Sequence, residues 1–323
     1  MSVLNIREAE REGARLVIGM AGISGSGKTY SALELAYGLA NYDAGKVGFL
    51  DTENRRGSLY ANVFVDHPTH PTRKRFLIGD LYAPFSPQRY VDAIMEFQAI
   101  GVEVLVVDSV SHEWEGQGSC EDIAHAGQRM ADWKTAKREH KRFMNALLQS
   151  NMHVIACIRA REKTDFRNPK APVSLGIQPI CEKNFMFEMT ASLMMWSEGK
   201  AQDVLKCPAE LRAILGRGEG YITARDGKAL RDWVDGAKQL DPRVEQARNT
   251  LRTVCEQGTD ALVKEWQALP KDVRAAISPA GPCPDEFKLA AKEFDAARAK
   301  DGGRQLDDLN EQLAGGGDAE QAA

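Results

Sequence analysis

Residues 22–29 read Gly-Ile-Ser-Gly-Ser-Gly-Lys-Thr, which matches the phosphate-binding pattern G-x-x-x-x-G-K-[ST] at every fixed position. This stretch constrains the fold more than any other, because the pattern works only between a buried strand and the N-terminus of a helix. Its glycines let the backbone turn so that consecutive N–H groups point at phosphate oxygens. We therefore predict that a nucleoside triphosphate, ATP, binds through Gly22, Ser24, Gly25, Ser26, Gly27, Lys28 and Thr29.

The residues on either side of this stretch agree with the prediction. Residues 16–21 form a short apolar run typical of a central parallel strand, and residues 30–40 carry apolar side chains at helical spacing. In that setting we expect Lys28 to reach the β and γ phosphates and Thr29 to ligate Mg²⁺. The alternative interpretation is a chance glycine-rich turn between a strand and a helix.

Further apolar runs predict a mainly parallel sheet with helices between its strands. The expected strands cover residues 46–53, 76–82, 102–109 and 153–158. A helix is predicted from Pro87 to about Ala99, and closing strands are predicted at residues 191–196 and 203–207. Asp226-Gly227 is interpreted as a turn before a short helix over residues 229–237.

Charged side chains end several of these strands, and ligands of open α/β sheets lie at the carboxyl ends of the strands. Asp51 and Glu53 follow one strand, and either could simply cap a turn. A triphosphatase needs a carboxylate that orients and deprotonates the attacking water, and Glu53 is our candidate for that role. Glu113 or Glu115 becomes the candidate if Glu53→Gln hydrolyses ATP normally.

Asp108 ends the apolar strand that follows the first motif by about eighty residues, and it is predicted to hold Mg²⁺ through water near Thr29. Arg159 and Arg161 lie at the tip of the next strand, where they could sense a γ-phosphate in the same subunit or in a neighbour. The predicted catalytic residues are therefore Glu53, Lys28, Arg159 and Arg161.

Two polar segments follow these strands. Residues 111–133 precede a basic helix that begins near Lys134 and reaches Gln149, and its bases could equally form a solvated face. Residues 162–179 are predicted to be a loop of about 18 residues, which is long for a compact domain and indicates a functional or disordered segment.

The composition is that of an ordinary globular protein, with 43% hydrophobic and 27% charged residues among 323. No apolar run approaches the ~20 residues of a membrane span, and nothing suggests export, so we expect a cytoplasmic protein without membrane partners. The six cysteines are scattered without a C-x-x-C pair, and they are interpreted as reduced thiols, not as disulfides or a zinc site.

We expect four parts along the chain: an extension over residues 1–15, an ATPase domain over residues 16–238, a helical module over residues 241–300 and a disordered acidic tail over residues 301–323. The tail holds six acidic residues and one arginine, so its charge is −5 and that of the rest is +1. A nucleic-acid-binding function would therefore depend on local basic clusters and not on bulk charge.

The phosphate loop, Asp51-Thr52-Glu53, Asp108-Ser109-Val110-Ser111 and Arg159-Ala160-Arg161 together resemble the core of RecA-type recombination ATPases. They are more closely similar to the phage-encoded, AAA-annotated RecA-like ATPases that accompany single-strand annealing recombination. The resemblance covers about residues 16–196. It implies an α/β, RecA-like P-loop NTPase fold with a mainly parallel central sheet flanked by helices, plus the small C-terminal helical module.

By this resemblance Glu53 activates water, Asp108 is the magnesium-associated acid, and the segments 111–134 and 162–179 contact DNA. The implied DNA-binding residues are Lys134, Arg161, Lys163, Arg167 and Lys170. Only about fifteen polar residues precede the first strand, so the N-terminal polymerisation strand and helix of RecA are not apparent.

The function predicted from the sequence is a Mg²⁺-dependent ATPase that acts on single-stranded DNA in phage-type recombination or repair. The expected partners are single-stranded DNA, a single-strand annealing or single-strand-binding protein, and further copies of the chain. Two alternatives remain at this point: a phosphotransferase for a small molecule, and an ATP-gated assembly factor that does not hydrolyse ATP.

Overall fold

The computed structural model describes residues 15–126, 132–165, 172–236, 242–278 and 281–298. The predicted extension and the acidic tail, except for Arg15, lie outside these residues. The chain divides into two compact units, one of which spans residues 11–239 while the other holds the C-terminal part from residue 240. The predicted domain boundaries stay a prediction. Among the described residues, no helix combines the length and apolar character that crossing a bilayer requires.

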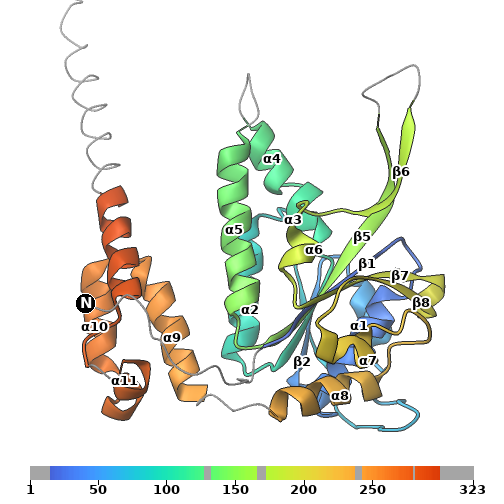
Figure 1. The fold of residues 1–323 in the computed structure, drawn as a ribbon, viewed down its shortest axis with the longest axis horizontal. Coiled ribbons are helices and arrows are strands. Elements are labelled where there is room, and N and C mark those ends of the chain that lie inside the picture. The colour runs from blue at the N-terminus through green and yellow to red at the C-terminus, as the bar shows by residue number, and fades with distance from the viewer. Residues whose placement is uncertain (1–14, 127–131, 166–171, 237–241, 279–280, 299–323) are drawn as a thin grey trace, which may run out of the picture. The chain divides into compact units, whose positions relative to one another are not determined.

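The larger unit is built on one eight-stranded sheet, as Figure 1 shows. The strands are β1 (Val17–Gly22), β2 (Val47–Asp51), β3 (Leu77–Asp80), β4 (Val104–Asp108), β5 (His153–Asp165), β6 (Val173–Pro179), β7 (Ala191–Trp196) and β8 (Ala201–Lys206). Their order is β3-β2-β4-β5-β1-β7-β8, and β6 pairs with β5 outside this path. All pairs from β3 to β7 along this path are parallel, so the predicted α/β class with a mainly parallel central sheet is confirmed.

Helices cover both faces of the central part of the sheet, and this explains why β1, β2, β4 and β7 are buried along all or nearly all of their length. The helices of this unit are α1 (Lys28–Leu39), α2 (Pro87–Ala99), α3 (Ser111–Glu115), α4 (Cys120–His125), α5 (Trp133–Gln149), α6 (Phe185–Glu188), α7 (Arg212–Leu215) and α8 (Ala224–Asp235). Successive residues of β4 alternate between two cores. Val104 and Val106 pack with α1 and α8, whereas Leu105 and Val107 pack with α2, α5 and α6.

The segment predicted as a long loop is a β-hairpin, so that prediction was wrong. β5 continues beyond the parallel sheet to Asp165, and β6 returns antiparallel to it, with Ala160 opposite Pro179 and Asp165 opposite Val173. Most side chains of the outer part are exposed, so the usual apolar strand signal is missing there. Residues 166–171, which include Arg167 and Lys170, lie outside the described residues.

The turn predicted at Asp226-Gly227 is also wrong, because both residues lie in the first turn of α8. The carboxylate of Asp226 accepts from the Thr223 backbone N–H in a capping box, with Oδ2 at 2.8 Å from that nitrogen. Gly227 is required by packing and not by a turn, because a Cβ there would lie within van der Waals distance of α1 backbone, 2.8 Å from the Leu39 nitrogen. The predicted strand 203–207 begins at Ala201, two residues earlier.

The C-terminal unit is helical, as predicted. It contains α9 (Pro242–Cys255), α10 (Thr259–Ala268), α11 (Lys271–Ile277) and a helix over residues 285–298. Its own core gathers Ala247, Leu251, Cys255, Leu262, Trp266, Val273, Ile277, Phe287 and Ala291. Leu289, on the last of these helices, is 62% exposed and lies outside this core.

Candidate nucleotide and magnesium site

The phosphate-binding stretch lies where β1 ends and α1 begins, as the sequence predicted. Gly27 caps α1 with φ of 86° and Gly25 has φ of 78°, a left-handed backbone that glycine adopts without strain. A Cβ at Gly27 would lie 2.5 Å from the carbonyl carbon of Glu198, so a side chain there would collide with backbone. This close-fitting turn at a helix N-terminus fits a phosphate chain, because it presents backbone donors and the positive end of the helix dipole.

Lys28 lies folded into this loop. Its Nζ donates to the carbonyl oxygens of Gly22 at 2.9 Å and Ile23 at 2.8 Å, and its side chain is buried. Burial lowers the pKa of Lys28, while the nearby Asp108 and Glu53 carboxylates oppose that shift. The ammonium group therefore already stands inside the loop to which phosphates would bind.

Thr29 and Asp108 meet directly, with the Thr29 hydroxyl donating to the Asp108 carboxylate at 2.5 Å. The parallel register places Asp108 opposite Asp51 on β2 and Cys157 on β5, at the carboxyl edge of the sheet. Burial raises the pKa of Asp108 to about 6, although the hydrogen bond from Thr29 opposes the shift. A hydroxyl and a carboxylate in contact are a donor set that fits Mg²⁺, so these are the residues that would hold the ion.

The two acids that end β2 have different environments. Asp51 is buried, and its carboxylate accepts from the backbone N–H groups of Glu53 at 2.7 Å and Gly57 at 2.6 Å, so it caps the turn. The Glu53 side chain accepts from the Ser109 hydroxyl at 3.1 Å and lies 3.8 Å from Arg159 Nε. It also retains 19% of its accessible surface. Glu53 is therefore the strand-end carboxylate that remains available to a water molecule.

Arg159 links Glu53 to a histidine that the sequence analysis did not identify. The guanidinium Nη1 donates to Nε2 of His112 at 3.2 Å, and Nδ1 of His112 lies 2.9 Å from the Thr52 hydroxyl. Since arginine only donates, Nε2 must accept, and the His112 ring is neutral with its proton on Nδ1. Burial and the Arg159 charge lower the pKa of His112, which agrees with this assignment. Only its position four residues after Asp108 could have identified it.

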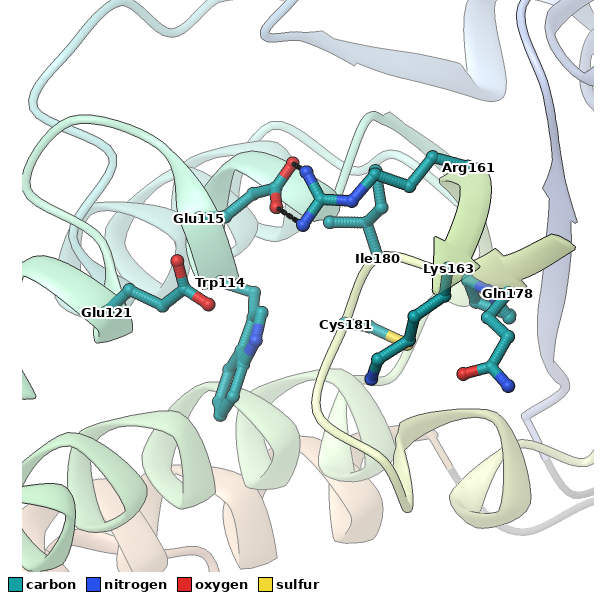
Figure 2. Close-up of a pocket in the computed structure, with 9 residues that line it drawn as sticks. Trp114, Glu115, Glu121, Arg161, Lys163, Gln178, Ile180 and Cys181 are labelled. Atoms are coloured by element: carbon teal, nitrogen blue, oxygen red, sulfur yellow. Dashed lines mark hydrogen bonds and ion pairs between the residues drawn. The ribbon is translucent and has the colours of Figure 1, made fainter. Parts of the chain in front are cut away.

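Arg159 and Arg161 are on the same strand but have different partners. Arg159 pairs in register with Gly22 of the phosphate loop. Arg161 instead forms an ion pair with Glu115, with Nη2 to Oε2 at 3.0 Å, as Figure 2 shows. The structure thus brings Arg159, Glu53, Lys28, Thr29 and Asp108 together and places Arg161 in a separate surface pocket.

This pocket lies between α3 and the β5–β6 hairpin and has mixed charge (Figure 2). It is lined by Trp114, Glu115, Glu121, Arg161, Lys163, Gln178, Pro179, Ile180 and Cys181. Lys134 is exposed at the start of α5, next to Trp133, whose ring stacks on Trp114 at a centroid distance of 5.9 Å. Of the predicted DNA-binding residues, Arg161 and Lys163 therefore share the pocket, and Lys134 lies beside an aromatic pair that reaches it.

The alternative catalytic acids have other contacts. Glu113 is buried and accepts from His140 and Cys120. Glu115 is held by Arg161, and burial raises its pKa. In the described structure neither has the contacts with Ser109 and Arg159 that place Glu53 at the edge of the sheet.

Comparison with known families assigns the region of this site to one family. Residues 14–191, more than half of the chain, match the model of the family described as AAA domain. A crystal structure of a KaiC-like protein from the hyperthermophilic archaeon Pyrococcus horikoshii OT3 is similar, with 16% sequence identity over 61% of this chain and 81% of that chain. The TM-score of this match is 0.36. Comparison with curated proteins gives no match.

Proposed function

The chain belongs to the AAA domain family of P-loop proteins, and from this we propose that it is a Mg²⁺-dependent ATPase acting on single-stranded DNA in phage-type recombination or repair. The main observation in support of this proposal is that the single strand β5 runs past both candidate sites. This strand holds Arg159 beside Glu53 and the phosphate loop, and two residues later it holds Arg161 in the pocket of Figure 2.

The chemistry proposed for the first site follows from its residues. Lys28 and the backbone donors of the loop would neutralise the phosphates, and Thr29 and Asp108 would hold Mg²⁺, which would supply further positive charge against the phosphates. Glu53 orients a water molecule and accepts its proton, while the neutral His112 holds Arg159 at the edge of the sheet. Arg159 is half-exposed and sits where it can compensate charge that develops on the γ-phosphate.

The second site has the parts that non-specific binding of single strands requires. Arg161 and Lys163 supply positive charge, and the stacked pair of Trp114 and Trp133 offers an aromatic surface for bases. Glu115 competes with a phosphate for Arg161, because it already pairs with that guanidinium. Movement of β5 when ATP binds beside Arg159 would be transmitted along the same strand to Arg161.

The proposal extends to partners on the same grounds. A single-strand annealing or single-strand-binding protein would share the DNA substrate. A neighbouring copy of the chain could place a carboxylate, or the phosphates of the nucleotide bound to it, beside Arg159. The side chain of Arg159 is 51% exposed and therefore accessible to such a neighbour.

Salt-dependent DNA binding tests the second site. We expect Arg161→Ala and Lys163→Ala each to weaken binding of single-stranded DNA and to reduce the slope of log K against log salt by about 0.7, the value for one phosphate contact. Glu115→Gln should strengthen binding at low salt, because it frees Arg161. Lys74→Ala, which removes an exposed lysine paired with Asp43, is the matched control. Unchanged affinity and slope in both pocket variants would contradict the proposal.

A further inference from the structure

We propose that Glu113, Cys120 and His140 form a buried site for a divalent transition metal, with Zn²⁺ as the ion that fits best. The three residues come from α3, α4 and α5, which follow one another along the chain between β4 and β5. A metal ion held by them would link these three helices.

The three side chains already converge in the described structure. One possible ligand atom from each residue lies within 4.8 Å of those of the other two, and all three residues are buried. His140 Nδ1 lies 3.1 Å from both Glu113 oxygens, and Cys120 Sγ lies 3.1 Å from Oε1. A carboxylate, an imidazole and a thiolate are ligands that zinc takes together, whereas Mg²⁺ prefers oxygen ligands alone.

Charge balance also favours a divalent ion at this place. The Glu113 carboxylate and a Cys120 thiolate carry two negative charges and the His140 ring is neutral, so a divalent cation leaves a buried group with no net charge. On binding, the thiol proton is released to solvent. The proton on Nδ1 of His140 is replaced by one on Nε2, so Nδ1 can coordinate the ion. A water molecule takes the fourth tetrahedral position.

The proposed metal site and the pocket of Figure 2 share a neighbour, Trp114. The Trp114 ring packs edge-on against His140 at a centroid distance of 5.5 Å, and Trp114 also lines the pocket. Ser119, next to Cys120, is buried, and its hydroxyl has no hydrogen-bond partner among the residues that the structure describes. It offers a buried polar group beside Cys120 that could contact a ligand water, since each donor and acceptor in a protein interior needs a partner.

Cobalt titration of the full chain tests the site directly. The protein is reduced with a phosphine that does not chelate metals, and an excess of Mg²⁺ occupies the Thr29–Asp108 site. We expect one Co²⁺ per chain, with the thiolate-to-cobalt charge-transfer absorption and the visible bands of tetrahedral cobalt. Added Zn²⁺ should displace the cobalt and abolish both.

Variants separate a metal site from a hydrogen-bonded network that only supports the fold. Cys120→Ser and His140→Gln should each weaken Zn²⁺ binding by more than the 10–100-fold expected for an outer-shell partner, and Cys120→Ser should remove the charge-transfer band. Cys207→Ser, a thiol of the same unit outside the group, should bind like the unaltered chain. Far-ultraviolet circular dichroism establishes that each variant is folded. If the folded, unaltered chain binds no cobalt with thiolate absorption, the proposal is wrong.

Discussion

Two acids that end the same strand show how backbone contacts assign roles to single residues. Asp51 and Glu53 both follow a buried strand, and the sequence pattern treats them alike. The structure uses both Asp51 oxygens to cap backbone N–H groups, whereas Glu53 faces Ser109 and Arg159 with part of its surface exposed. Glu53 can therefore contact a water molecule through its exposed part, whereas Asp51 could do so only by releasing the backbone N–H groups that it caps.

Substitution of Glu53 by glutamine tests this assignment. The amide oxygen can still accept from Ser109, but the side chain can no longer take a proton. We expect ATP binding to be retained and steady-state hydrolysis to fall by about 100-fold or more, the usual contribution of a general base. Calorimetric ATP titration and phosphate release measure the two effects. Glu96→Gln, exposed on α2, is the control, and normal turnover of Glu53→Gln would return Glu113 and Glu115 to consideration.

The buried His153 leads us to predict that the stability of the fold depends on pH. His153 is fully buried, its Nδ1 accepts from the Leu16 backbone N–H at 3.0 Å, and burial lowers its pKa to about 3. The unfolded chain has a histidine pKa of about 6.5 and so binds the proton first as the pH falls. The contribution of the neutral, buried His153 to the free energy of unfolding is therefore complete above about pH 6.5. It is lost progressively as the pH falls towards 3.

We expect this histidine alone to reduce the free energy of unfolding by roughly 2 kcal/mol between pH 7 and pH 5. His153→Asn removes the titrating ring but keeps an oxygen near the position of Nδ1, so its stability should fall less over that interval. Urea denaturation at the two pH values gives the comparison, with the exposed His125→Asn as control. Equal pH dependence in His153→Asn and the unaltered chain would refute the account.

At the scale of elements, the packing of α1 against α8 depends on two glycines. A Cβ at Gly38 would lie 2.6 Å from the Lys228 nitrogen and closer still to the Ala224 carbonyl oxygen. A Cβ at Gly227 would meet α1 backbone at Leu35 and Leu39. The two helices therefore approach backbone to backbone, which no side chain larger than hydrogen permits.

Helix propensity and packing predict opposite signs for Gly38→Ala. Propensity alone would stabilise α1 by up to about 1 kcal/mol. The collision with α8 forces the helices apart, and overpacking of this kind costs about 1–3 kcal/mol. We therefore expect net destabilisation in both Gly38→Ala and Gly227→Ala, measured as a lower denaturation midpoint with an unchanged m-value. A stabilised variant would show that the helices separate freely.

The same elements show what the sequence could predict. The core strands were predictable because they are buried on both faces, so each is a continuous apolar run such as Val104 to Val107. The outer half of the β5–β6 hairpin was missed although Val173 and Leu175 alternate with polar residues as in a strand, because the prolines and charged residues just before this short run favour a loop. The start of α8 was missed because Asp226-Gly227 has turn chemistry, and only contact with α1 explains the glycine.

At the scale of the whole molecule, the sheet brings residues from distant parts of the sequence to one edge. The phosphate loop, Glu53, Asp108 and Arg159 could be predicted, because strand ends in a parallel sheet converge. His112 and the pairing of Arg161 with Glu115 could not, since both depend on how α3 lies against β5. The larger unit thus places the candidate nucleotide site and the mixed-charge pocket of Figure 2 along one continuous strand.

Steady-state ATP hydrolysis with and without single-stranded DNA tests the central claim most directly. The assay is run at low salt with Mg²⁺, and Lys28→Ala, which should lose hydrolysis, gives the background rate. We predict that single-stranded DNA raises the rate for the unaltered chain and that this stimulation is lost in Arg161→Ala. An ATPase rate that is the same with and without DNA, or no hydrolysis above the Lys28→Ala background, would contradict the account.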